Sequence, residues 1–175
     1  YAFNSDISGW DVSNVWNVDS MFMRCYDFNQ DLSSWDVSSM TYMLGMFLFA
    51  SDFTSDLSNW DVSSATVMHS MFSQADSFNS DLSNWNVSNV TGMQGVFEGA
   101  DSFNSDISGW DVSNVNTFVA MFAWGASSFN QDLSGWAISA TANLEYMFEG
   151  GANLSEENKC AMHGAFQSNS SWPYG

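Results

Sequence analysis

Tryptophan recurs at an almost constant interval in this chain of 175 residues, and the same phrase of sequence surrounds each copy. The interval is 25 residues and once 26, at Trp10, Trp35, Trp60, Trp85, Trp110 and Trp136. A fixed period of this length is typical of stacked repeats. Because so short a unit cannot bury its apolar residues alone, neighbouring units must stack and share one elongated core. The sequence therefore predicts a solenoid of six turns.

Four columns of the aligned repeats are apolar in every copy, which is how a solenoid fills its interior. Two columns are phenylalanine, namely Phe3, Phe28, Phe53, Phe78, Phe103 and Phe129, and Phe22, Phe47, Phe72, Phe97, Phe122 and Phe148. The other two are aliphatic, namely Ile7, Leu32, Leu57, Leu82, Ile107 and Leu133, and Val12, Val37, Val62, Val87, Val112 and Ile138. We expect all four columns to form the core.

The apolar spacing within a unit predicts its local structure. From Val12 to Phe28 the apolar residues follow one another in steps of three or slightly more, which indicates a 3₁₀ or short helical coil. From Leu32 to Val37 the step falls to two, as in a short β-strand. Each turn is thus predicted to hold one short parallel strand and one coil.

The repeated phrase resembles that of a known family. The motif F-N-x-D-L-S-x-W-D-V-S-x-V-T-x-M-x-x-M-F, which covers about residues 1–155, is similar to the repeat of BspA-like leucine-rich-repeat surface proteins of bacteria. The piece L-x-x-W-x-V resembles the leucine-rich-repeat strand, with Trp in place of the middle Leu. The resemblance implies a leucine-rich-repeat-like solenoid in a secreted or cell-surface protein that serves adhesion or protein contacts, and it implies no catalytic residue.

The predicted organisation is a repeat solenoid over residues 1–154 and a C-terminal capping segment over residues 155–175. Ser155 is suited to begin a helix, and Glu156 and Glu157 favour its positive end, so we expect a helix to about Phe166 that covers the last turn. The first turn has no such cap, so its edge is expected to be open. The chain begins at Tyr1, inside a repeat and without Met, and we therefore expect it to be part of a longer protein.

The charge of the chain limits its partners. Twenty acidic residues face only Arg24 and Lys159, which gives a net charge of -18. Such a field repels phosphate backbones and anionic lipid, so nucleic acid is disfavoured as a partner. No apolar stretch has the length of a membrane span, so membrane insertion is not expected. Cations, basic proteins and neutral sugars remain compatible with this charge.

Two acidic columns allow two interpretations. The first column is complete and contains Asp6, Asp31, Asp56, Asp81, Asp106 and Asp132, whereas the second, which begins at Asp11, is interrupted by Asn86 and Ala137. We expect the first column to accept backbone N–H bonds at a corner of each turn. The alternative is Ca²⁺ held by the carboxylates and neighbouring Asn oxygens, although no known calcium-loop spacing is present. An Asn ladder, which begins at Asn4, is expected at the same corners.

The variable columns point to a partner surface. At coil positions outside the core, the early repeats carry large apolar side chains where later repeats carry Gly, Gln or Glu. We take as candidate partner-binding residues Trp16, Tyr42, Leu44, Leu48 and Phe49. Clustered exposed apolar groups mark interfaces, including self-association. The alternative is that these side chains fold inward or meet a further repeat.

Catalysis is not expected, because a repeat lacks the asymmetry of an active site and the two histidines, His69 and His163, lie in different regions. We expect a binding or adhesion module, secreted or on the cell surface, that recognises a protein or glycan partner. The alternative is a calcium-stabilised structural module without a ligand of its own. Ice binding is a weaker alternative, because the column with Thr41, Thr66 and Thr91 is not threonine throughout.

Overall fold

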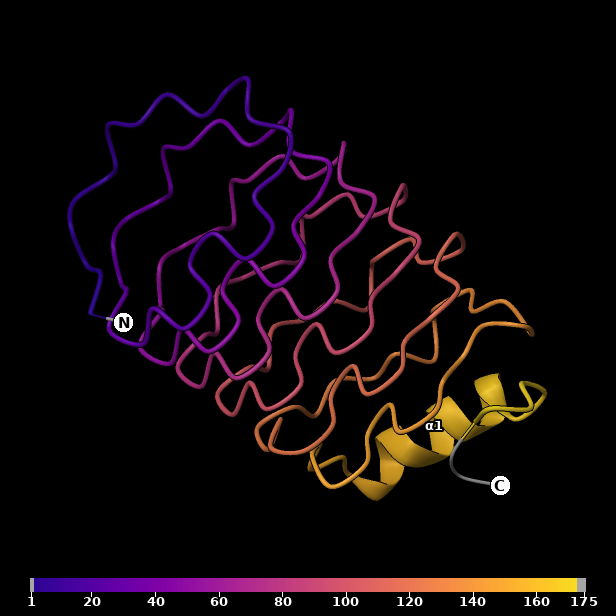
Figure 1. Cartoon of the computed structure of the whole chain (residues 1–175). Coiled ribbons are helices and arrows are strands. Elements are labelled where there is room, and N and C mark those ends of the chain that lie inside the picture. Colours follow the sequence, from indigo (N-terminus) through magenta and orange to yellow (C-terminus); the bar gives the residue numbers. More distant parts are fainter. Residues whose placement is uncertain (1, 173–175) are drawn as a thin grey trace.

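The computed structural model describes residues 2–172 and shows a chain that winds turn upon turn from the N-terminus to a single helix at the far end (Figure 1). Consecutive turns are joined by parallel β-bridges between residues 25 or 26 positions apart. These bridges are Asn17 to Tyr42, Tyr42 to Val67, Val67 to Gly92, Gly92 to Thr117 and Thr117 to Asn143. The repeat architecture predicted from the tryptophan period is therefore present.

The core of the stack is a continuous slab of aromatic rings. The rings of Phe22 and Phe28, which belong to the two phenylalanine columns, lie 4.1 Å apart and nearly parallel. Phe22 and Phe47, in successive turns, are stacked at 5.5 Å. The phenylalanines of these two columns are fully buried from the second turn to the fifth. Burial of each such ring stabilises the fold by roughly 1.5–3 kcal/mol. The four columns thus form the core as predicted, except that Phe3 is exposed and Ile138 is half-buried.

The strand predicted for Leu32–Val37 is wrong. In this segment the amide of Trp35 donates to the carbonyl oxygen of Leu32 at 3.1 Å, which closes a tight turn. The same carbonyl oxygen accepts the indole Nε1 of Trp60 from the next turn, at 3.0 Å. A side chain, and not a strand ladder, therefore joins the turns at this corner.

The parallel contacts lie instead in the segment 16–24, which was predicted to be helical coil. Alternate amides donate to the next turn, as Val18 does to Tyr42 at 3.0 Å and Ser20 to Leu44 at 2.7 Å. Between them, the amide of Met21 donates back to Val18 in the manner of a 3₁₀ turn. The segment thus combines short turns with isolated bridges, and within residues 2–172 no continuous strand forms.

This alternation requires left-handed backbone at two positions in each turn. The first position holds Ser20, Gly45, Ser70, Gly95, Ala120 and Tyr146, and the second holds Arg24, Phe49, Gln74, Gly99, Trp124 and Gly150, all with φ between 45° and 65°. Glycine suits this conformation without strain, whereas other residues adopt it at some cost. Large side chains at these positions therefore need another reason to be there.

The predicted C-terminal helix is confirmed. Helix α1 spans Glu156–Phe166, and Ser155 Oγ accepts the amide of Asn158 at its N-terminus. Met162 and Phe166 of α1 are buried, and the Trp172 ring packs edge-on against Phe166 at 5.2 Å. α1 thus covers the last turn (Figure 1). Pro173 and Tyr174 of the predicted capping segment lie outside the described residues.

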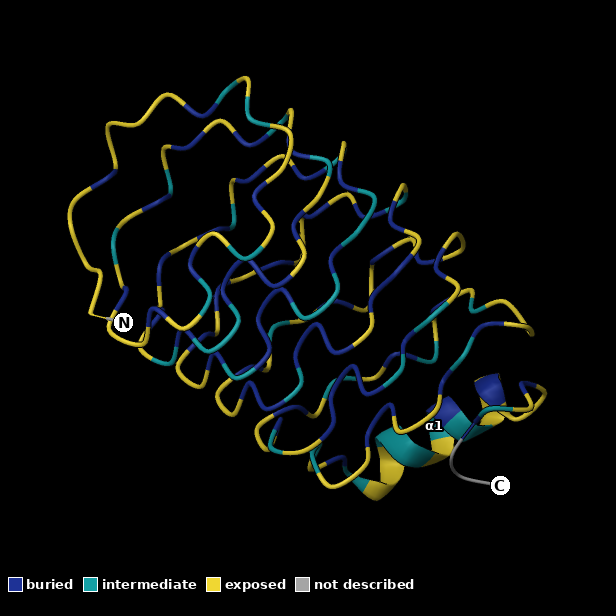
Figure 2. Cartoon of the chain, in the orientation of Figure 1, coloured by how far each residue is buried: buried dark blue, intermediate teal, exposed yellow. Residues whose placement is uncertain are grey.

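The opposite edge of the stack is open, as expected. In the first turn Phe3 is 37% and Trp10 52% exposed, whereas their equivalents Phe28 and Trp35 are 0% and 5% exposed. Figure 2 shows this first turn exposed along most of its length. In the described part of the chain, no helix is both long and apolar enough to cross a membrane.

Candidate functional site

The outward side of the segment 16–24 and its equivalents in the later turns is the candidate binding surface, and we call it the laddered face. Val18 and Phe22 point into the core, whereas Trp16, Asn17 and Asp19 are exposed. Because the bridges hold each turn in register, the same outward positions of successive turns lie side by side. Sequence differences between the repeats are displayed on this face.

The five candidate partner-binding residues, Trp16, Tyr42, Leu44, Leu48 and Phe49, lie on the laddered face of the first two turns, and we call them the aromatic patch. The rings of Trp16 and Tyr42 meet edge to face, with centroids 6.0 Å apart. Trp16 is 60% exposed, and Tyr42 and Leu44 are 40% exposed. Leu48 and Phe49 are half-buried.

The exposure of Tyr42 and Leu44 does not arise from the open edge of the stack. The second turn has neighbours on both sides, because the Tyr42 amide donates to Trp16 and the Met43 amide donates to Val67. A further turn stacked on the first one would cover the first turn, but it would not change the exposure of side chains in the second turn. These two side chains therefore do not fold inward, and no further repeat stacked on the first turn would meet them.

Basic and acidic groups border the patch. The Arg24 guanidinium carbon lies 5.7 Å from the centre of the Phe49 ring, a cation–π arrangement. Asp19 Oδ1 accepts the amide of Leu44 at 2.8 Å, which fixes the backbone beneath that side chain. The patch thus stands on backbone that is fixed by hydrogen bonds to its neighbours.

The two histidines serve the fold. His69 Nδ1 accepts the amide of Gln94 at 3.1 Å, and burial lowers the pKa of the imidazole. The ring lies over Gly92, where a Cβ atom would collide with it. In the cap, His163 Nδ1 accepts the indole Nε1 of Trp172 at 3.2 Å. Sequence reasoning missed both contacts, because each one depends on a partner in another segment.

The first Asp column adopts the corner turn expected from the sequence. The Oδ1 atom of Asp56 accepts the amide of Ser58, two residues later, at 2.9 Å. The same bond forms at 2.9–3.0 Å in the other turns, from Asp6, Asp31, Asp81, Asp106 and Asp132. Hydrogen bonds from the serine backbone and side chain hold the pKa of the Asp56 carboxyl below its ordinary value. This role needs a carboxylate or amide oxygen at the corner in every repeat.

The second Asp column makes a second turn of the same kind, which explains its substitutions. Asp36 Oδ1 accepts the amide of Ser38 at 3.1 Å, and Asn86 Oδ1 accepts that of Ser88 at 3.2 Å. An amide oxygen therefore replaces the carboxylate without loss of the bond. Ala137 has no such oxygen, and there the amide of Ile138 donates to the carbonyl of Trp136.

The Asn ladder links the backbone of successive turns. Asn29 Oδ1 accepts the amide of Thr54, and Asn104 Oδ1 accepts that of Asn130, both at 2.9 Å. At the end of the stack, Asn130 Oδ1 accepts the amide of Ser155 at 2.8 Å. The ladder thus continues into the cap, and Ser155 occupies the next Asn position.

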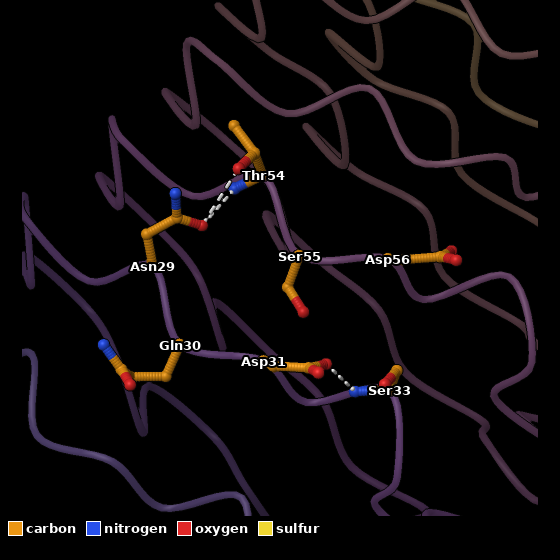
Figure 3. A pocket seen from close by; sticks show the side chains of 7 residues that line it. All are labelled: Asn29, Gln30, Asp31, Ser33, Thr54, Ser55 and Asp56. Atoms are coloured by element: carbon orange, nitrogen blue, oxygen red, sulfur yellow. Dashed lines mark hydrogen bonds between the residues drawn. The ribbon is translucent and has the colours of Figure 1, made fainter.

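Two polar hollows lie between turns beside these ladders. The first, of about 370 Å³, is lined by Asn29, Gln30, Asp31, Ser33, Thr54, Ser55 and Asp56 (Figure 3). The second, of about 420 Å³, is lined by Asn79, Asp81, Ser83, Asn104, Ser105 and Asp106. In each hollow the later of the two turns carries a short serine, Ser55 or Ser105. In the second turn the same column holds Gln30, whose Nε2 donates to Asn4 Oδ1 of the preceding turn at 2.7 Å.

Carboxylate and amide oxygens line both hollows, the chemistry that Ca²⁺ prefers. Within residues 2–172, no three Asp, Glu, His or Cys side chains gather closely enough to hold a metal ion. Asp31 Oδ1 and Asp56 Oδ1 are already bonded to serine amides. Calcium at these positions stays a prediction to be tested.

Two features of the surface escaped sequence reasoning. One is an acidic group in which burial, and then Asp101 and Asp52, raise the pKa of the Asp76 carboxyl. The other is an exposed ring pair on the laddered face, Trp124 and Tyr146, with centroids 6.2 Å apart. The fifth interval has one extra residue, directly after Trp124, and this insertion was the available signal.

Comparison with known proteins gives a family and nothing finer. A family model described as "Mycoplasma protein of unknown function, DUF285" matches residues 1–79 and 50–161. No curated protein matches the chain. No solved structure matches it either.

Proposed function

The chain belongs to the DUF285 family, described as Mycoplasma proteins of unknown function, and we propose that it is a non-catalytic binding or adhesion module. It recognises a protein or glycan partner through the aromatic patch and works outside the cell, secreted or at the cell surface. The observation that carries this proposal is the exposure of Tyr42 and Leu44 in a turn that is covered on both sides.

The composition of the patch supports partner binding. Trp and Tyr bring large contact areas at small entropic cost, and such residues supply most of the binding energy in many interfaces. The aliphatic neighbours Leu44 and Leu48 favour a protein partner over a glycan, because sugar recognition relies on flat rings and polar groups. Self-association through the same patch belongs to this proposal.

The charge of the chain supports a neutral or basic partner. With a net charge of -18, the surface repels nucleic acid and anionic membranes. The stacked repeat and its helical cap are compatible with the resemblance to BspA-like leucine-rich-repeat proteins, which motivates the extracellular location and the adhesive role.

The second candidate function is a calcium-stabilised structural module. It draws support from the two hollows, because each is lined by two carboxylates. Asp31 and Asp56 line the first, and Asp81 and Asp106 line the second. It is the weaker candidate, because the Oδ1 atoms of these residues already accept serine amides.

The test compares two double variants on arrays of glycans and immobilised extracellular proteins, with sedimentation velocity for self-association. The variant Tyr42→Ser with Phe49→Ser is expected to lose affinity by about tenfold or more, since central aromatic residues dominate binding. The control, Thr117→Ser with Gln74→Ser, changes the same two columns in other turns and is expected to bind as the wild type does. Equal binding and equal self-association of both variants would show that the aromatic patch does not bind the partner.

A further inference from the structure

The one departure from the 25-residue period lies on the laddered face, directly beside an exposed tryptophan. Aligned on the phenylalanine columns, the extra residue of the longer interval is Gly125, which follows Trp124. Its φ of 115° is accessible to glycine, and a Cβ there would lie 3.4 Å from Gly99 Cα in the preceding turn. Single insertions in a regular ladder redirect side chains and are frequent at functional sites.

The backbone at this place would favour glycine over the residues present. Trp124 and Tyr146 have left-handed φ values of 45° and 59°, where the same columns elsewhere hold Gly99 and Gly95. Both rings are about half exposed, at 52% and 49%. Two strained and exposed aromatic residues in adjacent turns stabilise neither backbone nor core, and such strain is concentrated at functional sites.

The ring pair is held in a defined position. The indole of Trp124 lies over Gly150, where a Cβ atom would be 3.2 Å from the indole Cδ1. The Trp124 amide donates to the carbonyl of Glu149 at 2.8 Å. Glycine in the next turn thus leaves room for the indole, and Tyr146 packs beside it at a tilt of 31°.

The electrostatic surroundings of the pair are negative. Glu145 and Glu149 are exposed in the same turn as Tyr146. The whole chain has twenty acidic residues and only two basic ones. Aromatic faces attract cations, and nearby carboxylates add to that attraction. An equivalent arrangement exists within the chain, where the Arg24 guanidinium lies over Phe49, in the column that also contains Trp124.

We propose that Trp124 and Tyr146, with Glu145 and Glu149, form a site for a cationic side chain, arginine or lysine, of a partner protein. The site goes beyond the proposed function, because it lies in the fifth and sixth turns and does not involve the aromatic patch. A partner that spans the laddered face would make an apolar contact near the N-terminus and a cationic contact near α1.

The experiment titrates the full chain with the capped peptide acetyl-Arg-Arg-Arg-Arg-amide at about 0.15 M ionic strength. The readouts are the affinity and the indole NMR signal of Trp124. The test variants are Trp124→Gly and Tyr146→Gly, which introduce the residue that other turns carry in the same columns, so folding is preserved. The matched control is Gln74→Ser, which changes the column that contains Trp124 but in the third turn, outside the aromatic patch. The neutral probes are the citrulline form of the peptide and a neutral hexasaccharide.

We expect the arginine peptide to shift the Trp124 signal and to bind at least fivefold more weakly to each glycine variant. The Gln74→Ser variant should bind it as the wild type does, and the citrulline peptide should be inactive. Equal affinity for wild type and both glycine variants would show attraction by the overall charge alone and would overturn the site. Binding of the hexasaccharide that is lost in Trp124→Gly, without an effect on the arginine peptide, would overturn it in favour of a sugar site. Absence of arginine-peptide binding to the wild type would also overturn it.

Discussion

The indole Nε1 of Trp60 donates a 3.0 Å hydrogen bond to the carbonyl oxygen of Leu32 in the preceding turn. The bond recurs from Trp35, Trp85, Trp110 and Trp136 at 2.9–3.2 Å. The tryptophan period is therefore also the period of a side-chain link between turns. Leucine at this position would fill space but would leave a buried carbonyl without its second donor.

Replacement of Trp60 by Phe tests this link. The variant keeps an aromatic ring but removes the Nε1 donor, so we expect the free energy of unfolding to fall by about 1–3 kcal/mol, measured by urea denaturation. Trp10→Phe is the matched control, because Trp10 lies at the open edge and is 52% exposed. Equal losses in the two variants would contradict a structural role for the indole N–H.

The acidic group around Asp76 predicts a pH dependence of opposite sign to that of the corner aspartates. Burial, with Asp101 and Asp52, raises the pKa of Asp76 in the folded chain. Stability from its protonated form is therefore present at low pH and is lost as pH rises through the folded pKa. We expect Asp76→Asn to raise the melting temperature at pH 7 and to have no such effect at pH 3.

Asp56→Asn is the control, because it removes the same charge. Hydrogen bonds from Ser58 lower the pKa of Asp56 in the folded chain. Its contribution to stability is therefore present above the unfolded pKa and is lost as pH falls through the folded value, below about pH 4. A melting temperature at pH 7 that rises equally in both variants would indicate relief of overall charge and not of a local group.

Glycine at a left-handed position is expected to be more stable than alanine there. Gly99 has a φ of 65°, and a Cβ there would collide with the Gln74 amide. We expect Gly99→Ala to lower the free energy of unfolding by about 1–3 kcal/mol. Gly109 has no positive φ, and a Cβ at that position would meet open space, so Gly109→Ala should change it by less than about 0.5 kcal/mol. Thermal unfolding that ranks the two variants in the other order would contradict this assignment.

The sequence predicted the stack and the cap because those features depend on residue type at fixed intervals. Phe22 and Phe47 are alike and buried, and Ser155 followed by two glutamates is a local signal for the start of a helix. The strand predicted at Leu32–Val37 was wrong because apolar residues two positions apart also fit a tight turn. That turn is linked to the next one by the hydrogen bond from Trp60. The bridges at Asn17 and Tyr42 were not predicted, since alternate left-handed residues break the ordinary strand pattern. On the laddered face, the exposure of Tyr42 could be anticipated because its column varies between the repeats. The pairing of Trp124 with Tyr146 depends instead on the backbone conformation at Gly125.

Calcium provides a further test of the corner aspartates. Each Oδ1 atom of the first column already accepts a serine amide. We therefore expect the melting temperature to be the same with Ca²⁺ and with chelator at fixed ionic strength. A saturable rise in the melting temperature with Ca²⁺ would favour the calcium-stabilised module. A ligand at 100 times its Kd raises the free energy of unfolding by about 2.7 kcal/mol. Loss of that shift in Asp31→Asn with Asp56→Asn would place the ion in the first hollow.

Site-specific photocross-linking at position 42 tests the binding role of the aromatic patch most directly. A benzoylphenylalanine side chain would replace Tyr42 in one variant and Thr117, its equivalent in the fifth turn, in the other. Both variants would be illuminated with the partner selected on the arrays, and alone at high concentration. We predict a covalent adduct, with the partner or with a second copy, from position 42 and much less from position 117. Equal yields from the two positions, or an adduct from position 117 alone, would contradict binding through the aromatic patch.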